Sequence, residues 1–169
     1  GEERSLSLGE NAFRDCYSLR SVRLEPTIIY RGPQPFDQCD QLEELYLRNY
    51  EYSGGDQPAA PSEAAPLWEL FSNYSDFHTS SLNEVHIGYM DCIPDNFCTG
   101  FAWLGSVTVD NLASPVVGDS AFEYCSSLYE INIPDVTEVG SRAFAGSGIS
   151  SFDGKNLVSL GGEAFADSD

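Results

Sequence analysis

The side chains that could do chemistry in this 169-residue chain are five cysteines, two histidines and 27 carboxylates. Zinc sites use cysteine and histidine ligands at short spacings such as C-x-x-C, and the sequence has no such spacing. His78 and His86 accompany no nucleophile motif of the G-x-S-x-G kind, and neither a P-loop, a dinucleotide fingerprint nor H-E-x-x-H occurs. We therefore expect no enzyme activity, no catalytic residue, no metal site and no cofactor.

The cysteines fall into two groups. Three of them each follow a phenylalanine by three residues, at a position that holds serine in two later copies of the same pattern: Cys16, Cys39, Cys125, Ser147 and Ser168. A position that accepts either residue indicates a small buried packing site. Cys92 and Cys98 lie outside this pattern and could form a disulfide with each other, and the odd total leaves at least one free thiol.

Two oxygen-rich motifs have ordinary interpretations as well as functional ones. The segment Asp91 to Asn96 (D-C-I-P-D-N) could contribute calcium ligands, but it lacks EF-hand spacing and reads as a polar turn. The sequon Asn73-Tyr74-Ser75 accepts a glycan only in a eukaryotic secretory pathway. Neither motif identifies a site.

The charge is strongly negative, at −19, and unevenly distributed. Residues 49–141 hold 14 acidic residues and no lysine or arginine. Nucleic acid is an unlikely partner, because phosphate binding needs a basic surface. The charge keeps an extended molecule soluble, and a cationic partner or bound calcium is the sharper alternative. No apolar run is long enough for a membrane helix, so we expect no membrane insertion.

One sequence unit recurs along most of the chain. The segment L-G-E-N-A-F-R-D-C-Y-S-L-R-S-V-R-L (8–24) returns as V-G-D-S-A-F-E-Y-C-S-S-L-Y-E-I-N-I (117–133) and, one residue shorter, as V-G-S-R-A-F-A-G-S-G-I-S-S-F (139–152). Weaker copies lie at 32–47 and 93–109, and a partial one at 160–168. The repeated anchor residues, which we expect in the core, are Phe13, Phe36, Phe97, Phe122, Phe144 and Phe165.

The anchors are 21 to 25 residues apart except between Phe36 and Phe97. We place a further copy in that gap, with Phe71 or Phe77 as its anchor and Leu82, Val85 and Ile87 in its strand. This gives one domain over residues 1–169, of about seven units, the last incomplete.

Each unit combines two patterns. The L-x-x-[VIL]-x-[VIL] stretch has the period of a strand with one buried face, whereas G-x-x-A-F-x-x-C has helical spacing, and its glycine suits a tight entry turn. A single unit cannot bury its own apolar edge, but stacked units can. We expect an α/β leucine-rich-repeat solenoid with a curved parallel sheet on one side and short helices or turns on the other.

The unit resembles the BspA-like leucine-rich repeats of bacterial and protist surface proteins over about 8–48 and 82–169. The copies depart from that pattern at Pro35 and Asn96, where it has alanine, and at Ile93, where it has glycine. The resemblance implies a secreted or surface-attached binding protein rather than an enzyme. No signal or anchor is visible in the sequence, and fold alone does not determine function.

Residues 48–66 are rich in glycine, proline and alanine and break the period, which predicts an insertion loop. The segment after the insertion has helical spacing, which would place four side chains on one face: Leu67, Leu70, Phe71 and Tyr74. This segment is either a longer helix that covers the outside of the third unit or part of the binding face, where Tyr50, Tyr52 and Trp68 would supply aromatic contacts.

The outward positions of the strands form the most defensible binding surface. Alternation places one residue of each strand there, and adjacent flanking positions add two more; together these are Arg23, Tyr46, Arg48, Glu84, His86, Thr108 and Asn132. In the next copy the outward position is nearer Ser151 or Asp153. Aromatic residues and arginine are enriched at energetically important interface positions.

We therefore expect a non-catalytic, adhesion-type protein, extracellular or at the cell surface, that binds a protein or another extracellular macromolecule. The alternative is a structural spacer within a larger surface protein, with no ligand of its own. A contiguous aromatic patch would favour binding, and a featureless acidic face would favour the spacer. Stacks without evident caps also pair end to end, so self-association is possible.

Overall fold

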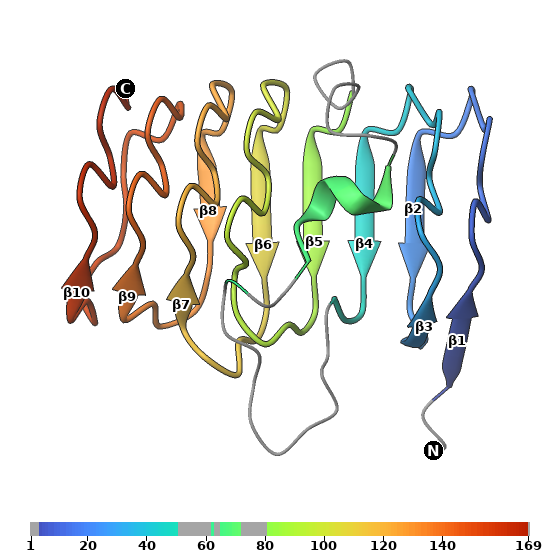
Figure 1. Cartoon of the computed structure of the whole chain (residues 1–169), viewed down its shortest axis with the longest axis horizontal. Coiled ribbons are helices and arrows are strands. Elements are labelled where there is room, and N and C mark those ends of the chain that lie inside the picture. Colours follow the sequence, from blue (N-terminus) through green and yellow to red (C-terminus); the bar gives the residue numbers. More distant parts are fainter. Residues whose placement is uncertain (1–3, 51–61, 63–64, 72–80, 169) are drawn as a thin grey trace.

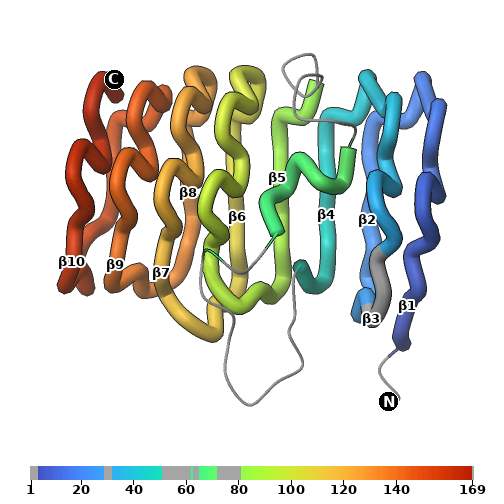
Figure 2. The backbone as a smooth tube through the Cα atoms, viewed as in Figure 1, coloured from blue at the N-terminus to red at the C-terminus, as the bar shows by residue number. Residues whose placement is uncertain are grey.

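A computed structural model shows a parallel β-solenoid, and it describes residues 4–50, 62, 65–71 and 81–168. Successive coils of the chain lie side by side along the long axis of the molecule, with β1 and β10 at opposite ends (Figure 1). The tube view shows the same succession, each coil running down one face and returning along the other (Figure 2). The expected leucine-rich-repeat architecture is confirmed, and turns occupy most of the side opposite the long sheet.

The long sheet has five parallel strands in the order in which they occur along the chain. They are β2 (Ser21–Leu24), β4 (Glu44–Leu47), β5 (Glu84–Ile87), β6 (Ser106–Val109) and β8 (Glu130–Asn132). Burial alternates along β4 to β6, so that Leu45, Val85 and Val107 point into the core. Period-two alternation therefore leaves one row of side chains on the outer surface.

Shorter strands build the opposite side. They are β1 (Ser5–Leu8), β3 (Thr27–Arg31), β7 (Val116–Val117), β9 (Glu138–Val139) and β10 (Ser159–Leu160). β1 pairs with β3, and β10–β9–β7 form a second sheet, all parallel. A bridge from Ile93 to Val117 continues this side toward the fourth unit.

The segment predicted from its helical spacing forms a turn in every unit except the third. Two residues per turn adopt a left-handed backbone, two before and two after the anchor position. In the fifth unit they are Ser120 (φ 53°) and Tyr124 (φ 60°), and in the sixth Arg142 (φ 55°) and Gly146 (φ 64°). An α-helix cannot continue through a left-handed residue. The apolar residues spaced by three and four therefore belong to a tight turn and not to a helix.

In four units the glycine four residues before the anchor is needed for close approach to the preceding unit: Gly32, Gly118, Gly140 and Gly161. A Cβ on Gly140 would lie 2.6 Å from the amide nitrogen of Asp119, and one on Gly161 would lie 2.4 Å from that of Ser141. Neither glycine has a positive φ. The expected role in an entry turn is therefore replaced by another: the missing side chain lets one unit rest on the backbone of the unit before it.

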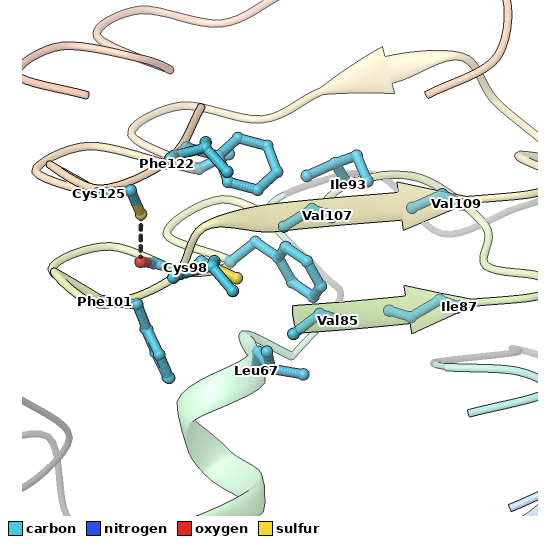
Figure 3. Packing of buried hydrophobic residues seen from close by; sticks show 14 of the residues in the cluster. Leu67, Val85, Ile87, Ile93, Cys98, Phe101, Val107, Val109, Phe122 and Cys125 are labelled. Atoms are coloured by element: carbon cyan, nitrogen blue, oxygen red, sulfur yellow. Dashed lines mark hydrogen bonds between the residues drawn. The ribbon is translucent and has the colours of Figure 1, made fainter. Parts of the chain in front are cut away.

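The core is a ladder of aromatic rings. Phe122 and Phe144 stack with centroids 5.2 Å apart, and Phe144 and Phe165 stack at 5.0 Å. At the other end Phe13 stacks on Phe36 at 5.2 Å. Figure 3 shows how the middle units pack Phe122 beside Ile93 and Val107, while Cys125 contacts the Cys98 carbonyl. Phe13 and Phe165 are half-buried, whereas the other four anchors are fully buried.

The fourth unit is out of the expected alignment by one residue. The amide of Cys98 donates to Ala121 O, the amide of Phe122 donates to Ala143 O, and that of Phe144 donates to Ala164 O. Cys98, not Phe97, therefore occupies the anchor position. The ring of Phe97 still packs on Phe122, at 6.0 Å, from the position that alanine holds elsewhere.

The third unit has a 3₁₀ helix, η1 (Leu67–Leu70), instead of the repeated turn. Its first amide donates to Phe97 O, and its last carbonyl accepts from the Phe36 amide, so it links the units on either side. Phe71 follows and packs on Phe36 and Phe101, at 6.0 and 6.2 Å. Of the two expected anchors, Phe71 lies in this register; Phe77, Tyr74 and most of the 48–66 insertion lie outside the described residues.

Candidate binding surface

The long sheet places the predicted outward residues in one row. Each is in direct register with its neighbour on the next strand, in the order Arg23, Tyr46, His86, Thr108 and Asn132. The alternation in the sequence was sufficient to find this row, because the apolar residues on either side of each position are drawn into the core. Ser151 and Asp153, the expected continuation, are not in a strand.

Contacts along the row join four units. The Arg23 guanidinium carbon lies 3.8 Å from the centre of the Tyr46 ring, and that ring meets His86 edge to face at 4.8 Å. Nε2 of His86 is 2.9 Å from Oδ1 of Asp110, which follows β6. A cation, a phenol, an imidazole and a carboxylate thus form a continuous polar-aromatic stack, which we call the Tyr46 stack.

The two charged ends of this stack are open to solvent, and Tyr46 and His86 between them are half-buried. The side chain of Arg23 is 62% exposed, and those of His86 and Asp110 are 33% and 47% exposed. Arg23 also forms an ion pair with Glu25, which fixes the guanidinium over the ring. The guanidinium, imidazole and carboxylate groups are therefore presented together on one sheet. Because their contacts already restrict the side chains, binding a partner would cost little further conformational entropy.

Acidic residues flank the stack where the strands begin. Glu44 and Glu84 occupy adjacent strands in direct register, and Glu130 begins β8. Arg48, a flanking residue of the predicted surface, is exposed at the other end of β4. The outer face therefore combines an aromatic centre with a carboxylate edge and is not featureless.

Thr108 and Asn132 continue the row with smaller polar side chains. Thr108 is half-buried and Asn132 is exposed, and the Tyr46 stack ends at Asp110. The contact surface thus changes from aromatic at β4 and β5 to hydrogen-bonding at β6 and β8.

Sequence patterns did not indicate an exposed pair of aromatic residues beside β6 and β8. Trp103 and Tyr129 are 63% and 62% exposed. The Tyr129 ring and the Asn83 amide both cover Gly105, where a Cβ would lie 2.8 and 2.9 Å from them. A residue with a side chain at position 105 would collide with both groups. Gly105 was therefore the feature of the sequence from which the packing of Tyr129 could have been inferred.

Other expected site residues lie elsewhere. Tyr50 is buried, and its hydroxyl donates to Ala65 O and Pro66 O, so it supports the insertion instead of offering a contact. Trp68 is half-buried. The remaining expectations for this region, Tyr52, the sequon at Asn73 and His78, lie outside the described residues.

The two motifs with possible metal or redox chemistry have structural roles. Asp95 accepts a hydrogen bond from the Asp119 amide, at 2.8 Å, and Asp91 is buried. No group of three or more histidine, cysteine or acidic residues in the described part of the chain could hold a metal ion. Cys92 and Cys98 do not form a disulfide with each other, so that suggestion is wrong.

Burial makes the inner thiols poor nucleophiles. It raises the pKa of Cys39 from 9.0 to about 11 and that of Cys92 to about 12. The pKa values of Cys98 and Cys125 are also raised, in both cases chiefly by burial. A thiol that stays protonated neither attacks a substrate nor binds a metal.

The stacked units define the molecule as a parallel solenoid repeat protein. Comparison with protein families matched the BspA type leucine rich repeat region, in six copies, to residues 2–56 and 72–169. The chain belongs to this family, whose repeats occur in surface or secreted proteins and are generally non-catalytic. Searches of the curated proteins and of the solved structures found no match. Among the described residues, no helix is both long and apolar enough to span a membrane.

Proposed function

We propose that this protein binds another macromolecule, a protein or other extracellular polymer, through the outer face of its long sheet, and that it works outside the cell or at its surface. The observation that carries the proposal is the Tyr46 stack. This partly exposed row of a cation, an aromatic ring and an imidazole on three adjacent strands includes arginine and tyrosine, two of the residue types that dominate interface energies. The family supports the location, because its repeats occur in surface and secreted proteins.

The geometry favours recognition over catalysis. His86 has one nitrogen bonded to Asp110 and its ring against Tyr46, so it resembles a side chain fixed for contact. General base catalysis would need a nucleophile within hydrogen-bond reach of the imidazole, and the two neighbours here are a carboxylate and an aromatic ring.

The test removes the stack and leaves the fold intact. Arg23→Ala with Tyr46→Ala should reduce capture of matrix or cell-surface proteins by the immobilised chain at least about tenfold, as expected for loss of a hot spot. The cation–π and aromatic contacts contribute about 1–2 kcal/mol to folding, so the thermal midpoint should change by only a few degrees.

A matched control removes the same residue types elsewhere. Arg14 and Tyr17 are also exposed, at 55% and 61%, but lie in the turn of the first unit. Capture that survives Arg14→Ala with Tyr17→Ala and fails in the stack variant supports the sheet face. Equal capture by both double variants would contradict it and favour the structural spacer.

A further inference from the structure

The sixth unit is one residue shorter than the fifth, and the long sheet stops at this point. β8 pairs with β6 on one side, but residues 149–153 form no strand. No backbone hydrogen bond between β8 and residues 149–153 occurs in the described structure. A sixth unit of the same length as the fifth would be expected to add a strand beside β8. Because this unit is one residue shorter, β8 has no partner strand on that side within the described residues.

A cleft of about 310 Å³ occupies this interruption. One wall is Ile131 to Val136, and the other is Phe152 to Asn156. Ile131, Ile133 and Phe152 are only partly buried, whereas the equivalent residues of β4 to β6 are fully buried. These three side chains give the cleft an apolar patch, although its exposed lining as a whole is more polar than apolar. Its volume is at the lower end of the range for small-ligand sites.

The rim of the cleft carries acceptors. Peptide groups alternate in direction along a strand, and the Glu130 amide faces β6, where it donates to Gly105 O. The carbonyls of Ile131 and Ile133 therefore face the cleft, together with the N–H groups of the same two residues. Asp135 and Asp153 add two exposed carboxylates.

The chain itself shows which group the rim attracts. Lys155 is the sole lysine of the sequence, and its Nζ lies 3.6 Å from Oδ2 of Asp153. This ion pair is loose, because the two side chains are 64% and 72% exposed. A loose internal ammonium at the mouth of the cleft can be displaced by a second one whose aliphatic stem also fills the cleft.

We infer that this cleft is a binding site for a lysine side chain of a partner polypeptide. The aliphatic stem packs against Ile131, Ile133 and Phe152, and the ammonium group is held at the rim by Asp153, Asp135 and the free carbonyls. The net charge of −19 steers cationic partners toward the molecule. The site adjoins Asn132 at the end of the predicted row, but it does not require the Tyr46 stack to bind anything.

The probe is a short glycine–serine peptide with one central lysine and blocked ends, added to the ¹⁵N-labelled chain and followed by NMR. Amide shifts should concentrate at Ile131 to Val136 and Phe152 to Asn156. A peptide with norleucine in place of lysine should bind at least about tenfold more weakly, because it keeps the stem and lacks the charge. Shifts spread over the acidic surface, or equal binding of norleucine, would overturn the site.

Variants separate this site from general charge attraction. Asp153→Asn and Asp135→Asn should each weaken lysine-peptide binding about fivefold, as loss of one charged partner does. Lys155→Ala should strengthen binding, because it removes the competing ammonium. Arg14→Ala makes the same change in net charge in the first unit and should have no effect; equal strengthening by the two variants would contradict the cleft.

Discussion

At the scale of single residues, Ser147 marks a local imperfection in the stack. It occupies the small packing position that holds Cys125 one unit earlier, and it is 3% exposed. Its hydroxyl makes no hydrogen bond within the described structure, whereas the Cys125 thiol donates to Cys98 O at 3.0 Å. A buried hydroxyl without a partner loses its hydration and gains nothing in return.

Ser147→Ala should therefore stabilise the protein, by about 1 kcal/mol, because it removes the desolvated hydroxyl without removing a contact. The free energy of unfolding in urea measures the effect. Ser127→Ala, at an exposed position one unit earlier, should leave it unchanged. A loss of stability in Ser147→Ala would show that the hydroxyl has a partner.

The buried thiols predict a loss of stability in alkaline solution. In the unfolded chain they ionise near the ordinary pKa of 9.0, whereas in the folded chain Cys39 and Cys92 keep their protons to about 11 and about 12. Above pH 9 the unfolded chain thus binds fewer protons than the folded one, and stability falls as the pH rises toward these values. Urea unfolding between about pH 8 and pH 10 measures the slope, and the Cys39→Ala, Cys92→Ala double variant should show a shallower one.

At the scale of elements, two adjacent glycines test how the units are stacked. A Cβ on Gly161 would lie 2.4–2.5 Å from backbone atoms of Ser141 and Gly140, but one on Gly162 would meet nothing within 4 Å. Gly161→Ala should cost about 1–3 kcal/mol, the range for overpacking, and Gly162→Ala should cost much less. Thermal unfolding compares the two variants, and equal midpoints would show that the last unit can shift away without cost.

The strands could be predicted because burial enforces their period, but the turns could not. Asn96 and Gly100 have the left-handed backbone that identifies the true register of the fourth unit, and both residue types tolerate it. In the fifth unit the same positions hold Ser120 and Tyr124, which carry no such preference. In the sequence, Phe97 matched the repeated phenylalanine more clearly than the turn residues marked the register. The alignment based on Phe97 was therefore wrong by one residue.

The two candidate sites differ in the same way. The outward row follows from period-two alternation within each strand, so its members could be named from the sequence. The stacking of Arg23 on Tyr46 depends on side-chain conformation and on Glu25, which no spacing reveals. The cleft beside β8 arises from a hydrogen-bond ladder that does not form, and the shortened repeat was its one visible trace.

At the scale of the whole molecule, the charge balance decides how salt affects stability. Specific ion pairs such as Arg142 with Glu123 and Glu163, at 2.7 and 2.5 Å, weaken when salt screens them. Repulsion among 27 acidic residues, opposed by only eight basic ones, also weakens. The repulsion involves many more pairs, and Glu44 and Glu84 show that some stand side by side on neighbouring strands.

Screening should therefore stabilise the protein. Raising NaCl from about 20 mM to about 300 mM shortens the Debye length from about 20 Å to about 6 Å, which removes repulsion between distant carboxylates while neighbouring ion pairs keep part of their attraction. The thermal midpoint should rise by several degrees. The midpoint of Arg142→Ala should rise more steeply than that of the parent, because the variant loses two attractive ion pairs that salt weakens and keeps the repulsion. A midpoint that falls with salt would mean that a few ion pairs across the stack outweigh the net charge of −19.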